Sequence, residues 1–181
     1  MTSPSPTPFN PNVDAVVEAN AGYAATFTEA GLQVEPLRHL AIVTCMDSRI
    51  DAFAILGLSN GEAHIIRNAG GVITDDVIRS LCLSQRLLGT REVILIHHTD
   101  CGLQKVAEPE FRAELEAELG VKPWWSLETF DDPYRDVRQS IQRLRMTPFV
   151  PHKDAISGFV YDVDDGRLHP VVDAAGEPVG P

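Results

Sequence analysis

Three residues of the sequence are suited to bind a soft metal ion together. Cys45 lies in the segment VTCMDSR, and His98 and Cys101 lie in ILIHHTDCG, where two residues separate them. Two thiolates and one imidazole are typical zinc ligands, and a tetrahedral zinc ion with only three protein ligands keeps a fourth position for water or substrate. The pattern therefore predicts a catalytic site with one Zn2+ per chain. The alternative is that these three side chains never meet.

Asp47 and Arg49 follow the first cysteine by two and four residues. A zinc centre with two thiolates is electrically neutral and acidifies its water less than one with three imidazoles, so a carboxylate that accepts a hydrogen bond from this water becomes useful. Asp47 could take this role, and the planar guanidinium of Arg49 could keep Asp47 ionised and oriented. The alternatives are a surface ion pair or an aspartate at a helix N-terminus.

The elements that must position these residues are strands alternating with helices. Short apolar runs predict buried strands at residues 39–44, 63–67 and 92–97, and helical patterns at 50–58 and 74–88 lie between them. This alternation indicates a parallel sheet covered on both faces. Ligands bind at the carboxyl ends of such strands, so the segments that follow the three strands are expected to converge at one edge.

The rest of the chain predicts further helices and a hairpin. Helices are expected at 110–119 and 134–145, and strands at 155–163 and 167–172 bracket the turn Asp164-Asp165-Gly166. The last strand would then pair antiparallel at the edge of the sheet. At the other end, four prolines within residues 2–12 predict a flexible tail over 1–12. Residues 13–30 predict a helical arm that ends at Gly31.

Length and composition limit the classes of protein that fit. We expect a single domain over the 181 residues, and the formal net charge of -11 disfavours nucleic acid or an anionic membrane as a partner. No apolar run approaches the roughly 20 residues of a membrane span, and the N-terminus lacks the pattern of a signal peptide, so a soluble, cytoplasmic protein is expected. Of the three cysteines, Cys82 lies on an apolar helix pattern and is expected to be a small hydrophobe, not a ligand.

The motifs CMDSR, RNAG and HTDCG, in this order, resemble those of the beta-class carbonic anhydrases, and the paired histidines of HHTDCG are similar to a short bacterial and archaeal branch. The resemblance implies that Cys45, His98 and Cys101 bind zinc and that Asp47 and Arg49 form a catalytic dyad. It also implies an α/β fold with strand order 2-1-3-4. The assembly would be a homodimer, or a higher even homo-oligomer, in which N-terminal helices wrap the partner.

The activity implied by the resemblance is the reversible hydration of carbon dioxide to bicarbonate, through attack by zinc-bound hydroxide. Hydrolysis of carbonyl sulfide or carbon disulfide at the same site is the alternative, and the motifs do not distinguish the two. A zinc-stabilised binding module and a redox thiol protein are the other classes considered. Some members of the family have a resting form in which the aspartate matching Asp47 occupies the fourth zinc position, and the sequence does not decide between the two forms.

Several neighbours of the predicted site allow both a functional and a structural interpretation. Gly102 could let its backbone amide approach the substrate, or it could serve a tight connection. His97 is expected to be structural, because adjacent residues of a strand point to opposite faces. Trp124 and Trp125 could line a pocket or a dimer contact, although core packing is the commoner role. Single histidines that could shuttle protons, none favoured over the others, are His39, His64, His152 and His169.

Overall fold

The computed structural model describes residues 10–173 and 175–180. The chain divides into two compact units, Met1–Leu32 and Gln33–Pro181, which are described separately. The predicted tail at 1–12 lies mostly outside the described residues, and a single domain over the whole chain stays a prediction. Within the described part of the chain, no helix is long and apolar enough to cross a membrane.

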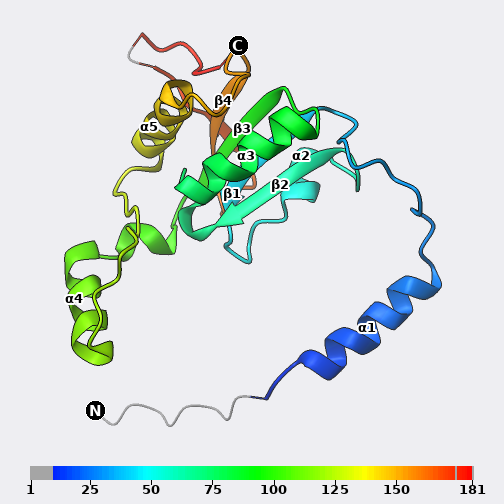
Figure 1. The fold of residues 1–181 in the computed structure, drawn as a ribbon, viewed down its shortest axis with the longest axis horizontal. Coiled ribbons are helices and arrows are strands. Elements are labelled where there is room, and N and C mark those ends of the chain that lie inside the picture. Colours follow the sequence, from blue (N-terminus) through cyan, green and yellow to red (C-terminus); the bar gives the residue numbers. More distant parts are fainter. Residues whose placement is uncertain (1–9, 174, 181) are drawn as a thin grey trace. The chain divides into compact units, whose positions relative to one another are not determined.

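The first unit contains helix α1, Val13–Ala25, shown in blue in Figure 1. The predicted arm at 13–30 is therefore five residues too long, and Gly31 is not its C-cap. The helix ends where the backbone N–H of Thr26 donates to Tyr23 O at 3.1 Å, at the start of a Thr-Phe-Thr run with low helix propensity. None of the residues of α1 is buried.

The second unit is built on a five-stranded sheet with the order β2-β1-β3-β4-β5 (Figure 1). Strands β1 to β4 are parallel, and β5 pairs antiparallel with β4, as predicted. The strands are Leu40–Cys45, Ala63–Asn68, Glu92–His98, Ile156–Tyr161 and Leu168–Pro170. The expected strand order is thereby confirmed, and the strand ends differ from the predicted ones by at most two residues.

Four helices and two short 3-10 turns connect the strands. They are α2, Ala52–Leu56; α3, Asp75–Leu87; α4, Glu108–Leu119; α5, Pro133–Met146; and the 3-10 turns η1, Ala69–Gly71, and η2, Gly102–Lys105. Local capping sets several of these ends: Thr74 Oγ1 accepts a hydrogen bond from Val77 N at 3.3 Å, and Asp51 Oδ1 accepts one from Ala54 N at 3.1 Å. The predicted helix at 50–58 is shortened to α2 between this Asp51 cap and Gly57, which has φ of 61°.

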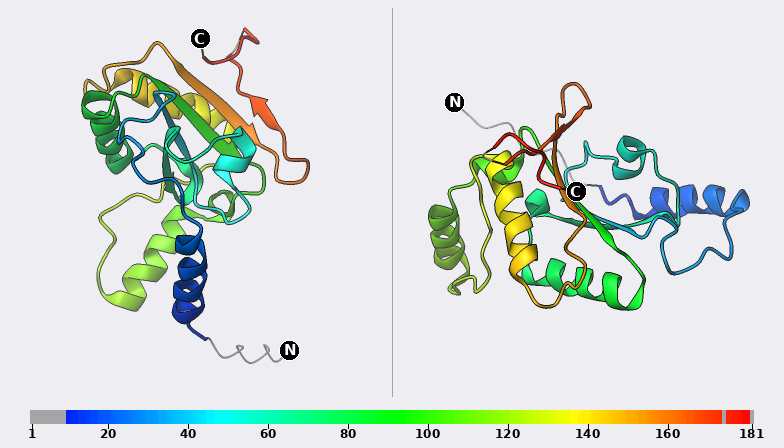
Figure 2. Two further views of the ribbon diagram at one scale, coloured as in Figure 1. Left: turned by 90° about the vertical axis from the view of Figure 1, so that its right-hand side faces the viewer. Right: turned by 90° about the horizontal axis from the view of Figure 1, so that it is seen from above.

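The sheet separates two layers of apolar side chains. Figure 2 shows α3 and α5 on one face of the sheet and α2 on the other. Leu81 of α3 and Leu144 of α5 are fully buried with Val43 and Leu95 in the larger cluster. Gly158 of β4 lets α5 approach closely, because a Cβ there would lie 2.3 Å from Val137 Cγ1. This packing fixes the carboxyl ends of β1 and β3 side by side.

Candidate metal centre

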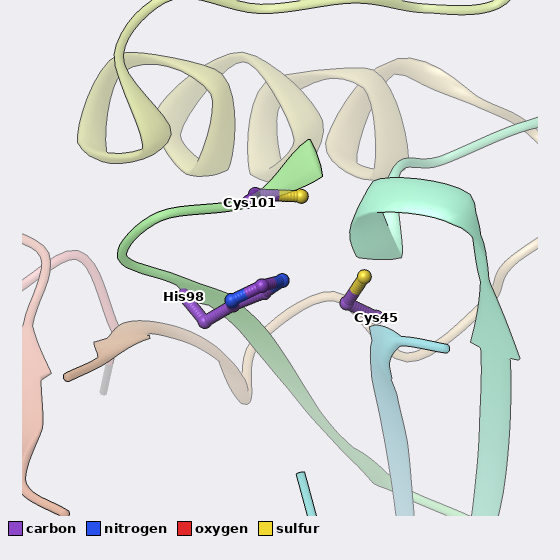
Figure 3. A group of neighbouring side chains, drawn as sticks. All are labelled: Cys45, His98 and Cys101. Carbon is purple, nitrogen blue, oxygen red and sulfur yellow. The ribbon is translucent and has the colours of Figure 1, made fainter. Parts of the chain in front are cut away.

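The three predicted ligands meet at the carboxyl ends of two neighbouring strands. Cys45 is the last residue of β1, His98 is the last residue of β3, and Cys101 directly precedes η2. All three are buried, and their ligand atoms lie within 4.8 Å of one another. Figure 3 shows the two sulfur atoms and the imidazole ring turned toward the same space. The alternative in which the three side chains never meet is thus excluded.

A backbone hydrogen bond selects the tautomer of His98. Its Nδ1 lies 2.9 Å from the carbonyl oxygen of Thr99 and must donate to it. The lone pair of Nε2 is therefore free, and this buried atom has no hydrogen-bond partner in the described structure. Thr99 is itself fixed to β4, since its N–H donates to Tyr161 O at 2.9 Å. A metal ion satisfies an otherwise unpaired buried imidazole nitrogen, and outer contacts of this kind are typical of metal-binding histidines.

The side chains of Cys45 and Cys101 shift each other's pKa in opposite directions. A hydrogen bond with the Cys101 side chain lowers the pKa of Cys45, against the effect of burial, and the backbone amides of Asp47 and Gly70 add to the lowering. The pKa of Cys101 is raised by the same interaction with Cys45 and by burial. A cation between the sulfur atoms would remove their repulsion and stabilise both thiolates. The residues therefore fit one zinc ion.

Asp47 and Arg49 form a two-pronged ion pair beside the three ligands. Arg49 Nε donates to Asp47 Oδ1 at 3.0 Å and Nη2 donates to Oδ2 at 2.8 Å, while the backbone N–H of Arg49 donates to Oδ1 at 2.9 Å. These contacts hold the pKa of Asp47 well below its usual range and raise that of Arg49. The lowered pKa means that the carboxylate is ionised. It also lies next to the cluster, since its Oδ2 atom is 3.9 Å from His98 Nε2.

Two charged residues near the dyad were not singled out by the sequence analysis. Asp100 accepts from Arg49 Nη1 at 2.9 Å and from Lys105 Nζ at 2.6 Å, and its φ of 54° allows the tight turn between the two ligands that flank it. Arg67, the first residue of the motif RNAG, donates to the carbonyl oxygens of Cys45 and Asp47 at 2.9 and 2.7 Å. Their positions within the motifs were the only sequence signal for them.

None of the other candidate residues belongs to the cluster of Cys45, His98 and Cys101. His97 points to the opposite face of the sheet from His98, and its Nε2 lies 2.7 Å from Asp136 Oδ2 of α5. Cys82 lies on α3 and lines a separate cavity of about 480 Å³. Gly102 is exposed, and no atom would come within 4 Å of a Cβ there, so close packing does not require this glycine. Trp124 is 88% exposed, which excludes core packing for this residue.

Together, the fold and the site define a parallel α/β protein with a three-ligand metal centre and an adjacent carboxylate–guanidinium pair. The profile of the family described as carbonic anhydrase matches residues 40–127. Beta-carbonic anhydrase 1 of Mycobacterium tuberculosis is 49% identical over 158 residues, which cover 87% of this chain and 96% of the relative. This chain therefore belongs to the carbonic anhydrase family, in its beta class.

Solved and curated relatives agree with this assignment. The crystal structure of carbonic anhydrase from Streptococcus mutans is similar with a TM-score of 0.84 and 43% identity, covering 91% of this chain and 99% of that chain. A carbon disulfide hydrolase of Saccharolobus solfataricus is 35% identical over 156 residues, covering 72% of this chain and 76% of the relative. The relatives of this chain thus include proteins named for two different activities.

Proposed function

We propose that this chain catalyses the reversible hydration of carbon dioxide to bicarbonate, with Cys45, His98 and Cys101 as the ligands of one zinc ion. The observation that carries the proposal is the position of Asp47, whose Oδ2 lies 3.9 Å from the unpaired Nε2 of His98 while Arg49 holds the carboxylate. Structural zinc sites use four protein ligands, whereas this cluster of the described residues offers three. A binding module with structural zinc has no need of the dyad.

The roles of the side chains follow from their chemistry. Zinc, when bound, supplies Lewis acidity that lowers the pKa of water toward about 7 and so provides a nucleophile at ordinary pH. Asp47 Oδ2 is placed to accept a hydrogen bond from the attacking water and to orient it toward the carbon of carbon dioxide. Arg49 keeps Asp47 ionised, so that this oxygen accepts and does not donate.

The surroundings of the cluster suit a small apolar gas. Ile50, Val72 and Phe130 are buried together with the two cysteines, and Leu103 packs against them. These side chains limit the number of competing water molecules near the reacting atoms. We propose that the substrate approaches along this apolar wall, and that Gly102, exposed at the start of η2, offers its backbone amide to the bicarbonate.

Hydrolysis of carbon disulfide or carbonyl sulfide is the second candidate, favoured by the 35% identity to a carbon disulfide hydrolase. One experiment distinguishes the two functions. The zinc-loaded protein is given each substrate in turn; carbon dioxide hydration is followed by the pH change, and hydrolysis of the sulfur compounds is followed by sulfide release. We expect hydration to dominate, in agreement with the more similar carbonic anhydrase relatives. Sulfide release far exceeding bicarbonate formation would overturn the proposed substrate.

The assembly proposed is a homodimer or a higher even homo-oligomer in the cytoplasm, with no nucleic-acid partner. It is supported by α1, which leaves Val13, Val16 and Val17 between 63% and 64% exposed, because an isolated helix of this length gains little stability unless its apolar side chains are covered. Sedimentation velocity tests the assembly. We expect Val17→Glu to lower the mass of the complex, and an unchanged mass would remove α1 from the interface.

A further inference from the structure

The side chain of Phe130 belongs both to the buried cluster that contains the two cysteines and to the wall of a polar cavity. Phe130 is 8% exposed and belongs to the same buried cluster as Cys45 and Cys101. It also lines a cavity of about 330 Å³. Most of the other residues that line this cavity are polar or charged: Gln104, Thr129, Asp131, Arg135, Asp136 and Gln139. Of the buried residues in this cluster, Phe130 is the one that also lines the polar cavity.

The first histidine of the HHTDCG motif supports this ring. His97 is fully buried, and the centroids of its ring and the Phe130 ring are 5.0 Å apart at an interplanar angle of 32°. Its Nε2 donates to Asp136 Oδ2 at 2.7 Å, and Asp136 lies on α5 and lines the cavity. The imidazole is therefore fixed by a charge-assisted hydrogen bond, which orients the face that it presents to Phe130.

Two further contacts hold Phe130 from other directions. A Cβ at Gly70 would lie 3.2 Å from Phe130 Cε1, so this glycine, with φ of 80°, leaves the ring just enough room. Gln104 connects Asp131, the residue after Phe130, to the metal-binding loop. Cys101 N donates to Gln104 Oε1 at 3.1 Å, and Gln104 Nε2 donates to Asp131 O at 3.1 Å. The ring position is consequently determined by β3, α5, η1 and η2 together.

We infer that Phe130 is a barrier that keeps water and solutes of the polar cavity away from the metal-binding thiolates, and that His97 is a positioning residue that holds it through Asp136. The inference deepens the proposed function and rests on it for the identity of the metal centre. Its chemical consequence is a low-dielectric side to the site, where thiolate–metal bonds resist exchange with external chelators and electrophiles. It also gives the buried His97, which supplies no metal ligand, a role.

The test measures how fast Cys45 and Cys101 of the metal-free full chain react with iodoacetamide, scored for each cysteine by peptide mass spectrometry. We expect Phe130→Ala to raise both rates by about tenfold, equal to about 1.4 kcal/mol in the opening equilibrium. Phe130→Leu, which keeps apolar bulk, is expected to stay close to the wild type. Leu144→Ala is the matched control, because it opens a fully buried core position on α5 away from the cysteines. If Phe130→Ala reacts no faster than Leu144→Ala, the barrier is refuted.

The role of His97 has a separate test in the same assay. His97→Ala is expected to accelerate labelling in the same direction as Phe130→Ala, and His97→Gln, which can still donate to Asp136, is expected to restore most of the protection. In the cobalt-loaded chain, loss of the visible cobalt absorption to a chelator should follow the same order. Wild-type rates in His97→Ala would overturn the positioning role. Because the labelling uses no substrate, a failure of the proposed hydration activity in the wild type would be seen separately.

Discussion

Gly71 of η1 packs so closely against Cys45 that a Cβ at position 71 would lie 2.9 Å from the backbone nitrogen of Cys45. The same atom would lie 2.9 Å from the carbonyl carbon of Thr44 and 3.2 Å from Ile96 O, and the φ of Gly71 is 71°. The end of β1, the end of β3 and the turn after β2 therefore meet around a position that only glycine can occupy. This contact sets where the first predicted metal ligand lies.

The first prediction concerns this contact. Gly71→Ala is expected to lower the free energy of unfolding by about 3 kcal/mol or more and to weaken zinc binding, because it adds a backbone clash to the strain of a positive φ. Denaturant unfolding and metal titration measure the two effects. The matched control is Gly57→Ala, which has a φ of 61° and no atom within 4 Å of the added Cβ, and should cost about 1 kcal/mol. Equal losses in the two variants would contradict the clash.

The second prediction separates the ligand cysteines from the third cysteine. Cys101→Ser should reduce the zinc content of the purified chain to a small fraction and abolish hydration activity, because a neutral hydroxyl is a poor zinc ligand. Cys82→Ser should keep both, since Cys82 lies on α3 outside the cluster. Elemental analysis and a carbon dioxide hydration assay are the measurements. Full zinc content in Cys101→Ser would show that the site is wrongly assigned.

A third prediction addresses the dyad. Asp47→Asn keeps the shape of the side chain but removes the charge that Arg49 holds, so kcat/KM for hydration should fall by about 100-fold while the zinc content stays constant. The control is Asp76→Asn, an exposed aspartate paired with Arg79 on α3. Stopped-flow assays of metal-quantified samples give the comparison. Unchanged kcat/KM in Asp47→Asn would remove the carboxylate from the reaction.

The sequence predicted the sheet and the cluster because both depend on local patterns. Buried parallel strands have continuous apolar runs, and their carboxyl ends must converge, so the meeting of Cys45 with His98 and Cys101 followed from strand positions. Contacts such as Arg67 with the carbonyl oxygens of Cys45 and Asp47 were not predictable, because they depend on the register of neighbouring strands and on long side chains. The exposure of Trp124 was missed for a related reason: composition does not show which segments leave the core.

The fourth prediction concerns Arg67. Loss of its two hydrogen bonds in Arg67→Ala should let the turn from Cys45 to Asp47 shift, and we expect kcat/KM to fall about tenfold with zinc retained. Arg67→Lys should restore little, because an ammonium group does not reproduce the two-pronged geometry of guanidinium. Arg38→Ala, which removes a surface pair with Glu62, is the control. Full activity in Arg67→Ala would show that the turn from Cys45 to Asp47 keeps its position without the hydrogen bonds from Arg67.

The last prediction follows from Glu108, which anchors the segment that carries both tryptophans. Burial opposes ionisation of Glu108, but hydrogen bonds from Leu127 N at 3.0 Å, from Arg112 and from Ser126 outweigh it and keep its pKa below the ordinary value. A carboxyl group with a pKa lowered in the folded state stabilises the fold above its unfolded pKa of about 4.3, and this stabilisation is lost as the pH falls through the folded value.

Intrinsic fluorescence reports on this segment, because the chain has two tryptophans and both Trp124 and Trp125 lie in it. The wild type should show an acid transition in fluorescence below about pH 4, before loss of helical circular dichroism. Glu108→Gln should show the altered fluorescence at neutral pH and lack this transition, because it cannot accept the same charge-assisted bonds. Glu110→Gln, in the same helical turn, should behave like the wild type. An identical acid transition in Glu108→Gln would mean that another group anchors the segment.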